Sequence, residues 1–333
     1  MSKIKKFCKK NTYYLYLLIA LAIIFIAMLF INTSFFTLGN FISMLEQMTD
    51  YAMMALGIMI CICAGGIDLS TVGVANMVAA ITASLLLKFV PEGTSVGGVI
   101  VGSILLVILA IVVGFAAGAF NGTLITKLGI PPMLATMSTN YLYTGICMVI
   151  TKGVSLSGIN QNFVDMFTFK AFNIIPLGII VFVIAAIYMW ISLTKGTFGV
   201  KLCMVGTNPT ATMFAGINND WIKIRTHITS SVLSAITGVL MLARLSSSRS
   251  DYGKSYSTQA ILIVILGGTA AVGGTFSIPG TIIGIFIIQA ITTGVGMTPG
   301  ANSYLKNLVY ATLLLAVMII DYFRTNRKVK VKK

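Results

Sequence analysis

Residues 51–80 read YAMMALGIMICICAGGIDLSTVGVANMVAA, an apolar run interrupted at its centre by Gly65-Gly66-Ile67-Asp68-Leu69-Ser70. Asp68 is the only charged residue of this run. Because about 20 apolar residues cross the hydrocarbon core of a bilayer, the flanking segments predict two membrane-spanning helices. A break between helices at membrane depth is tolerated only where its backbone faces protein or a water-filled path. The stretch therefore predicts a membrane protein with a buried or path-lining break at Asp68.

The composition of the whole chain agrees with this prediction. Of the 333 residues, 57% are hydrophobic and only 9% are charged, whereas soluble domains carry about 25% charged residues. This balance excludes a soluble enzyme with one membrane anchor. The sequence predicts an all-α polytopic membrane protein, a single domain over residues 1–333 with about ten transmembrane helices. The expected spans lie at about residues 13–31, 42–64, 72–88, 97–126, 132–151, 174–193, 226–246, 258–272, 277–298 and 303–323.

The basic residues predict the orientation of the chain. The net charge of +15 comes from 23 Lys and Arg against 8 Asp and Glu, and the basic residues gather in tails at about 1–12 and 324–333. Basic tails beside apolar spans follow the positive-inside rule, which favours contact with lipid head groups over nucleic acid. An even number of spans places both the N- and C-termini in the cytoplasm. On this topology the cytoplasmic segments hold sixteen basic residues and the outward segments seven.

Motifs for catalysis and metal binding are missing from the sequence. The glycine-rich stretch at 267–274 has no lysine for a phosphate-binding loop of the form GxxxxGK[ST], and neither HExxH nor GxSxG with a candidate triad is present. Cys61 and Cys63 lack the second pair or the histidines of a zinc site, which favours core packing and predicts no metal. The single histidine, His227, lies at a predicted span boundary without a carboxylate partner in the sequence, and we interpret it as an interface residue.

Three polar or glycine-rich features leave alternatives open. Asp68 is either a pathway or gate residue, or the N-cap of the next span, whose first turn holds Ser70 and Thr71. The stretch at 267–280 suits close helix packing or direct contact with a ligand. Glu46 and Asp50 lie one helical turn apart at the outward end of the second span, where they are either wetted rim residues or contacts for a partner.

Two loops are long enough to contact other proteins. The outward loop at 151–173 is rich in polar side chains and suits a soluble partner. In the cytoplasmic loop at about 194–225, Asn208 is a candidate N-cap of a short helix, Pro209 fits its first turn, and Gly216 is a candidate C-cap. Met213 and Phe214 would be exposed on this helix. An exposed apolar tip on the cytoplasmic side predicts docking into another protein.

Four motifs in a fixed order are together specific enough to indicate a family. They are Gly65-Gly-Ile-Asp-Leu-Ser70, Phe120-Asn121-Gly122 followed by Lys127-Leu-Gly-Ile-Pro131-Pro132, Gly206-Thr-Asn208 through Ala215-Gly216-Ile217-Asn218, and Gly267-Gly-Thr269 with Gly274 and Pro279-Gly280. With these motifs the chain resembles, nearly end to end, the permease subunits of the ribose-type, or simple-sugar, branch of bacterial ABC importers.

The resemblance implies an ABC importer permease fold in the bacterial cytoplasmic (inner) membrane. A second permease copy or a homologue would complete the pathway, and an external substrate-binding protein would deliver a pentose or hexose such as ribose or galactose. ATP and Mg would be bound by the partner ATPase, expected as a fused double ATP-binding subunit, and no cofactor is expected in this chain. The segment implied to couple to this ATPase comprises Asn208, Pro209, Met213, Phe214, Ala215, Gly216 and Ile217.

The expected mechanism is alternating access, in which ATP-driven closure of the ATPase pushes on the coupling segment. A substrate handed over by a binding protein needs only scattered polar groups along its path. The candidate pathway residues are Asp68, Ser70, Asn76, Asn121 and Asn140. Three alternatives remain: an ABC permease for a nucleoside or a sugar-like signalling molecule, a secondary carrier driven by an ion gradient, and a membrane-embedded enzyme, against which the missing catalytic motifs argue.

Overall fold

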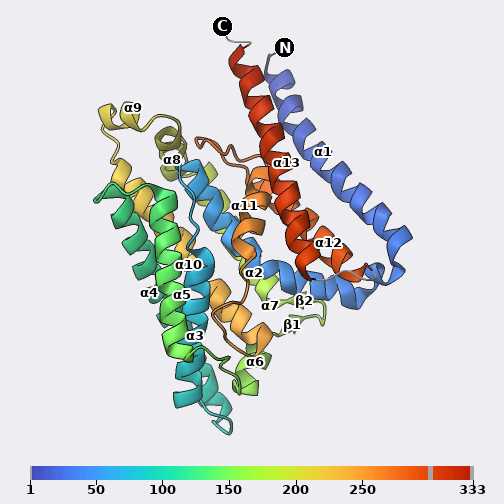
Figure 1. Cartoon of the computed structure of the whole chain (residues 1–333), viewed down its shortest axis with the longest axis vertical. Coiled ribbons are helices and arrows are strands. Elements are labelled where there is room, and N and C mark those ends of the chain that lie inside the picture. Colours follow the sequence, from blue (N-terminus) through green and yellow to red (C-terminus); the bar gives the residue numbers. More distant parts are fainter. Residues whose placement is uncertain (1, 299–302, 331–333) are drawn as a thin grey trace.

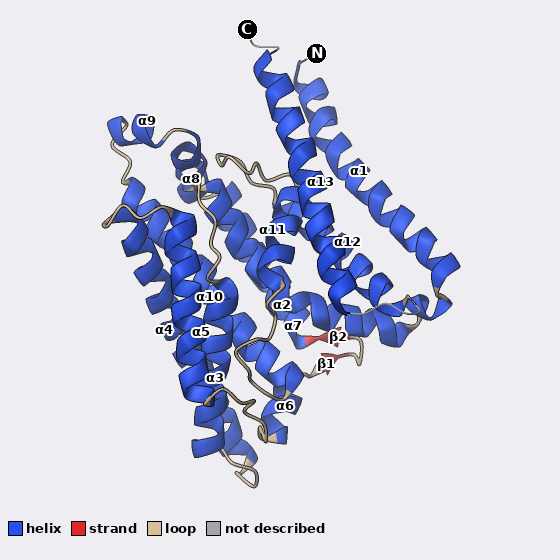
Figure 2. Cartoon of the chain, viewed as in Figure 1, coloured by secondary structure: helices blue, strands red, loops and turns tan. Residues whose placement is uncertain are grey.

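The computed structural model describes the backbone of residues 2–298 and 303–330, with side chains for residues 13–298 and 305–319. Within these ranges the chain is almost entirely helical (Figures 1 and 2). The helices are α1 (Ser2–Ile31), α2 (Leu38–Cys63), α3 (Thr71–Phe89), α4 (Val96–Thr126), α5 (Pro132–Thr151), α6 (Gln161–Phe167), α7 (Leu177–Thr194), α8 (Thr197–Thr207), α9 (Pro209–Phe214), α10 (Asn219–Leu245), α11 (Tyr256–Leu266), α12 (Ile278–Met297) and α13 (Ser303–Lys330). A 3₁₀ turn (Thr33–Phe36) and a two-stranded antiparallel sheet of β1 (Lys170–Ala171) and β2 (Ile175–Pro176) complete the described elements.

Each predicted span coincides with a helix, and the all-α polytopic class is confirmed. Seven of the described helices are long and apolar enough to cross a membrane by themselves. The eighth predicted span, 258–272, is only half helical, because α11 ends at Leu266 and Gly268 takes a φ of +90°. Hydropathy could not locate this end, since the residues that follow remain apolar. At 1.5 Å per residue, the 11 residues of α11 cover about half of a bilayer core.

The arrangement of the ends agrees with the predicted orientation. Both termini and α9 lie at one end of the molecule, and α6 with the β1–β2 hairpin lies at the other (Figure 1). The loop at about 194–225, predicted to be cytoplasmic, and the two tails are therefore on the same side, as an even number of crossings requires. Of the basic tails, Met1 and residues 331–333 lie outside the described residues.

The core is built around α2 and α10. The most apolar 18-residue stretch of α2 is 83% buried, whereas that of α1 is 6% buried, so α1 lies at the periphery of the described chain. Glycines at every fourth position of α4, namely Gly114, Gly118 and Gly122, allow α10 to approach closely: a Cβ at Gly118 would lie 2.5 Å from the His227 carbonyl oxygen. Small residues at this spacing are the usual means of close helix contact in membranes. They fix α10 against the inner bundle.

Candidate functional site

The break between α2 and α3 is stabilised by the Asp68 side chain. Asp68 is fully buried, and its Oδ1 accepts hydrogen bonds from the Ser70 backbone N–H at 2.9 Å and the Ser70 hydroxyl at 2.6 Å. A carboxylate that accepts such bonds satisfies backbone donors left free at a helix start. The N-cap alternative for Asp68 is wrong, because Ser70 occupies the N-cap position of α3 and Asp68 lies two residues before it, in a turn closed by these bonds. The gate role stays a prediction.

Two further predicted pathway residues join this network. Asn121 of α4 donates to the Ser70 hydroxyl at 2.8 Å, and the Tyr143 hydroxyl of α5 donates to the Asn121 amide oxygen at 3.4 Å. Asn140, also on α5, accepts a hydrogen bond from the backbone N–H of Gly73 at 2.9 Å. The structure therefore gathers Asp68, Ser70, Asn121 and Asn140 around the start of α3.

Asn76 lies apart from this group. Its amide donates to the carbonyl oxygens of Ser250 and Tyr252 at 3.1 and 2.9 Å. These carbonyls belong to the turns at 246–255 that precede α11. Buried backbone acceptors outside regular structure need such partners. Asn76 holds the irregular segment against α3, and its contact with a substrate stays a prediction.

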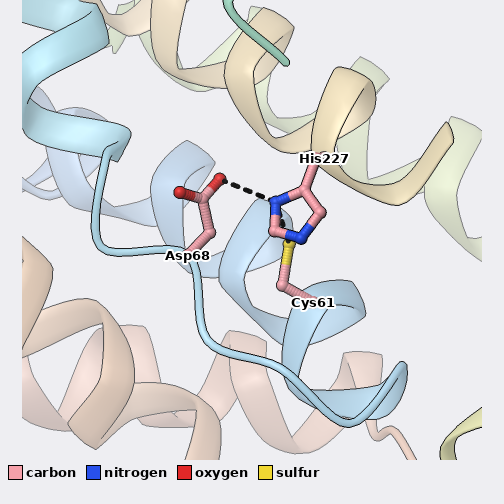
Figure 3. A group of neighbouring side chains, drawn as sticks. All are labelled: Cys61, Asp68 and His227. Atoms are coloured by element: carbon pink, nitrogen blue, oxygen red, sulfur yellow. Dashed lines mark hydrogen bonds and ion pairs between the residues drawn. The ribbon is translucent and has the colours of Figure 1, made fainter. Parts of the chain in front are cut away.

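A buried side-chain cluster that the sequence did not reveal lies on the other side of Asp68 (Figure 3). His227 of α10 places Nδ1 3.8 Å from Asp68 Oδ2 and 3.9 Å from Cys61 Sγ. The three residues are 0 to 4% exposed. The prediction that His227 is an interface residue without a carboxylate partner is wrong, because α10 packs against α2 and brings the His227 side chain to Cys61 and Asp68.

The predicted coupling helix is present as α9. The Asn208 side chain accepts from the Ala211 backbone N–H at 3.0 Å, and Pro209 is the first helical residue. The helix is capped at Ala215, and Gly216 follows with a φ of +75°, a conformation that glycine adopts without a steric penalty. The exposed apolar tip is confirmed, with Met213 63% and Phe214 84% exposed.

The helix α9 is joined to the start of α10 by side-chain hydrogen bonds. The Asn219 amide donates to the Pro209 carbonyl at 2.7 Å, and the Thr212 hydroxyl donates to Asn219 Oδ1 at 2.8 Å. Further along α10, the Arg225 guanidinium lies 4.3 Å from the ring centroid of Phe198 in α8, within the range of a cation–π interaction. A displacement of α9 would thus be transmitted to α10, which carries His227.

Comparison with known proteins matches residues 40–318 to the family described as "Branched-chain amino acid transport system / permease component". The chain belongs to this family. The ribose import permease protein RbsC of Bacillus subtilis (strain 168) is 31% identical over 304 residues, which cover 91% of both chains. RbsC of Escherichia coli (strain K12) is 30% identical over 309 residues, covering 91% of this chain and 92% of its own. The D-allose transport system permease protein AlsC of the same strain is 29% identical over 289 residues, covering 86% and 84%.

No solved structure matches the permease significantly. The resemblance to ribose-type permeases is confirmed by these relatives, and the chain is a multi-pass protein of the bacterial cytoplasmic membrane. The residues that carried the resemblance also lie close together in space. All four motifs meet at the cytoplasmic end of α2, where three of them supply glycines and Pro132 of the fourth lies against Gly66.

This glycine junction, formed by Gly65, Gly206, Gly273 and Gly274, joins α2, α8 and the loop before α12. The Gly274 backbone N–H donates to the Cys63 carbonyl at 2.9 Å. A Cβ at Gly206 would lie 1.8 Å from the same carbonyl oxygen, and one at Gly273 would lie 3.1 Å from Gly65 Cα. Two alternatives were open for residues 267–280: close packing or direct contact with a ligand. These contacts join backbone to backbone, and they therefore support packing.

A second buried ionic group lies at the outward end of the permease. Asp50 of α2 is 1% exposed and pairs with Arg244 of α10, while the Tyr256 hydroxyl donates to Asp50 Oδ2 at 3.2 Å. Glu46 pairs with Lys170 of β1 at 2.9 Å. The rim alternative is therefore wrong for Asp50, because α10 supplies its counter-charge inside the bundle. A cavity of about 100 Å³ borders this group, lined in part by Glu46, Asp50 and Arg244.

Proposed function

We propose that this permease is the membrane-spanning subunit of an ATP-driven importer for a sugar, with a pentose or hexose delivered by an external binding protein. The observation that carries the proposal is α9, whose exposed Met213 and Phe214 project from the end of the molecule where both termini lie. Such an apolar tip needs a partner with a groove. The named substrates of similar permeases, ribose, D-allose and galactofuranose, support a sugar.

In the proposed mechanism, the ATP-binding subunit binds ATP and Mg, and the binding of ATP closes this subunit. The groove of this subunit moves α9, and the hydrogen bonds of Asn219 pass the movement to α10. Because His227 of α10 packs against Asp68, the movement reaches the α2–α3 break. The permease itself, a single domain paired with a second copy or a homologue, supplies the path and no catalytic group.

The decisive experiment is uptake into proteoliposomes that contain the permease, its ATP-binding subunit and its external binding protein. We expect uptake of a labelled pentose or hexose that requires internal ATP and the binding protein. Unlabelled nucleosides and sugar-like signalling molecules serve as competitors for the alternative substrate classes. Full inhibition by a nucleoside but not by any sugar would reassign the substrate while keeping the importer.

A second candidate function is an ion-coupled carrier, which two observations favour. Asp68 with His227 and Asp50 with Arg244 are ionisable pairs inside the helix bundle, and such groups often line proton or ion paths. The same proteoliposomes separate the two functions. Uptake driven by a proton or sodium gradient without ATP and without the ATP-binding subunit would establish the carrier and overturn the importer.

A further inference from the structure

The side chains of Cys61, Asp68 and His227 form a compact group of metal-type donors. Their sulfur, oxygen and nitrogen atoms all lie within 4.8 Å of one another, and the view in Figure 3 shows the three side chains converging from α2, from the break and from α10. Zinc binds thiolate at about 2.3 Å and imidazole or carboxylate at about 2.0–2.2 Å, so its tetrahedral ligands stand roughly 3.3–3.7 Å apart. The two separations that involve His227 Nδ1, 3.8 and 3.9 Å, need a slight contraction, and the Cys61–Asp68 pair, within 4.8 Å, would close on binding the ion.

An unpartnered oxygen points to a missing ligand at this group. Asp68 Oδ1 is engaged by Ser70, whereas Oδ2 is buried without a partner at hydrogen-bond distance and has His227 Nδ1 as its neighbour at 3.8 Å; the Ser230 hydroxyl is likewise buried without a hydrogen-bond partner. Ser230 lies one turn after His227, and its side chain neighbours both Cys61 and Asp68. A buried polar atom without a partner costs about 1–3 kcal/mol. A cation bound among these atoms would satisfy Oδ2 and could take the Ser230 oxygen as a fourth ligand.

We propose that Cys61, Asp68 and His227 bind one divalent transition-metal ion of the zinc class. Thiolate, carboxylate and neutral imidazole together carry a charge of −2, which a divalent ion neutralises in a site that excludes water. On binding, the Cys61 thiol loses its proton to solvent and the Sγ–metal bond forms. The mixed sulfur, nitrogen and oxygen donor set favours zinc or cobalt over magnesium or calcium, which prefer oxygen ligands alone.

The bound ion would cross-link three elements of the fold. Cys61 is in the last turn of α2, Asp68 is in the break and His227 is two turns into α10. The site would therefore fix the α2–α3 break to the helix that follows the coupling segment. This binding is a property of the folded chain alone and does not depend on the identity of the transported substrate.

The test uses the full-length permease without an affinity tag, purified in detergent and stripped with a chelator. Titration with Co²⁺ is expected to give one bound ion per chain, a sulfur-to-cobalt charge-transfer band and the intense visible bands of four-coordinate Co²⁺. Zn²⁺ should displace the cobalt. Cys61→Ser should remove the charge-transfer band, and His227→Gln should lower the affinity at least tenfold.

The matched control is Cys63→Ser, two residues away on the same helix. Cys63 lies with its sulfur 3.7 Å from Cys203 Sγ, a thiol pair that could also attract a soft metal. We expect Cys63→Ser to retain the full cobalt spectrum. A spectrum lost in Cys63→Ser but kept in Cys61→Ser would place the metal at the other thiol pair and overturn the proposal.

The thermal midpoint of the unmodified chain tests the proposal even if a variant does not fold. Metal that binds only the folded state raises its thermal midpoint, so Zn²⁺ should raise the midpoint and the chelator should lower it. Absence of both a bound ion and a thermal shift would overturn the proposal. It would leave a metal-free Asp68–His227 pair as the explanation of the geometry.

Discussion

The exposed helix α9 and the buried cluster at Asp68 are built in opposite ways. The helix α9 is a contiguous segment that supplies its own caps and exposes Met213 and Phe214. The cluster combines Cys61 and Asp68 with His227, which lies 166 residues after Cys61, and it excludes solvent. The difference separates two tasks under the proposed function: the exposed element would meet a partner, and the buried contact would carry the movement inward. Substitutions in the first region should affect transport, and substitutions in the second should affect stability.

The largest effect on stability is expected at the glycine junction, where the two regions are joined. Gly206→Ala would place a Cβ 1.8 Å from the Cys63 carbonyl oxygen and 2.7 Å from the Gly274 nitrogen. Both are backbone atoms, so we expect a loss of about 3 kcal/mol or more, seen as a lower thermal midpoint in detergent. Gly145→Ala, where a Cβ would meet nothing within 4 Å, is the control. Equal midpoints for the two variants would contradict the packing.

The next effect is expected at Asp68. Asp68→Ala leaves the Ser70 N–H and hydroxyl without their buried acceptor, which should cost about 2–3 kcal/mol. Asp68→Asn keeps an acceptor oxygen and should recover much of this loss in a thermal-denaturation assay. If Asp68→Asn also retains full uptake and full coupled ATPase activity, Asp68 stabilises the turn before α3 and has no gate role. A stable Asp68→Asn variant without uptake would instead establish the gate.

A smaller effect is expected at the cap of α9. Asn208→Ala removes the acceptor of the Ala211 N–H and should cost the short helix about 1 kcal/mol. Hydrogen exchange of the amides at 211–215 should become faster, while exchange in α2 remains unchanged. Asn208→Ser, which restores a capping oxygen, should return the exchange rates toward those of the original chain. Failure of this rescue would show that the Asn208 side chain does not act as a cap.

The smallest effect on stability, with a large effect on transport, is expected at Phe214. Because its side chain is 84% exposed, Phe214→Ser should change the free energy of unfolding by about 0.5 kcal/mol or less. Binding of the ATP-binding subunit should nevertheless weaken at least tenfold, or about 1.4 kcal/mol. Phe172→Ser at the outward hairpin, where the side chain is 91% exposed, should leave this binding unchanged. Pull-down and uptake assays distinguish the two variants.

The sequence allowed prediction of the features that depend on neighbouring residues. The cap at Asn208, the end of α9 just before Gly216, the break at Asp68 and the helical class all follow from local chemistry and hydropathy. The contacts of His227 and Arg244 could not be predicted, because they depend on how closely α10 packs against α2 and α4. The only indication of these contacts in the sequence was that ionisable residues occur within apolar helices. Inside a membrane such residues require a partner. The end of α11 was missed because apolar loops and apolar helices have the same composition.

The first helix has a consequence for how the protein is made. The Tyr13 hydroxyl donates to the Leu266 carbonyl at 2.6 Å, across a sequence separation of 253 residues, and α1 packs mainly on α12. Ribosomes add about 5–20 residues per second, so this partner emerges on the order of 10–50 s after Tyr13. Before α12 is made, the contacts available to α1 are therefore those with the segment that follows it, where Phe25 packs against Phe35, Phe36 and Phe41. The nearly continuous apolar surface of α1 suits it to that interval.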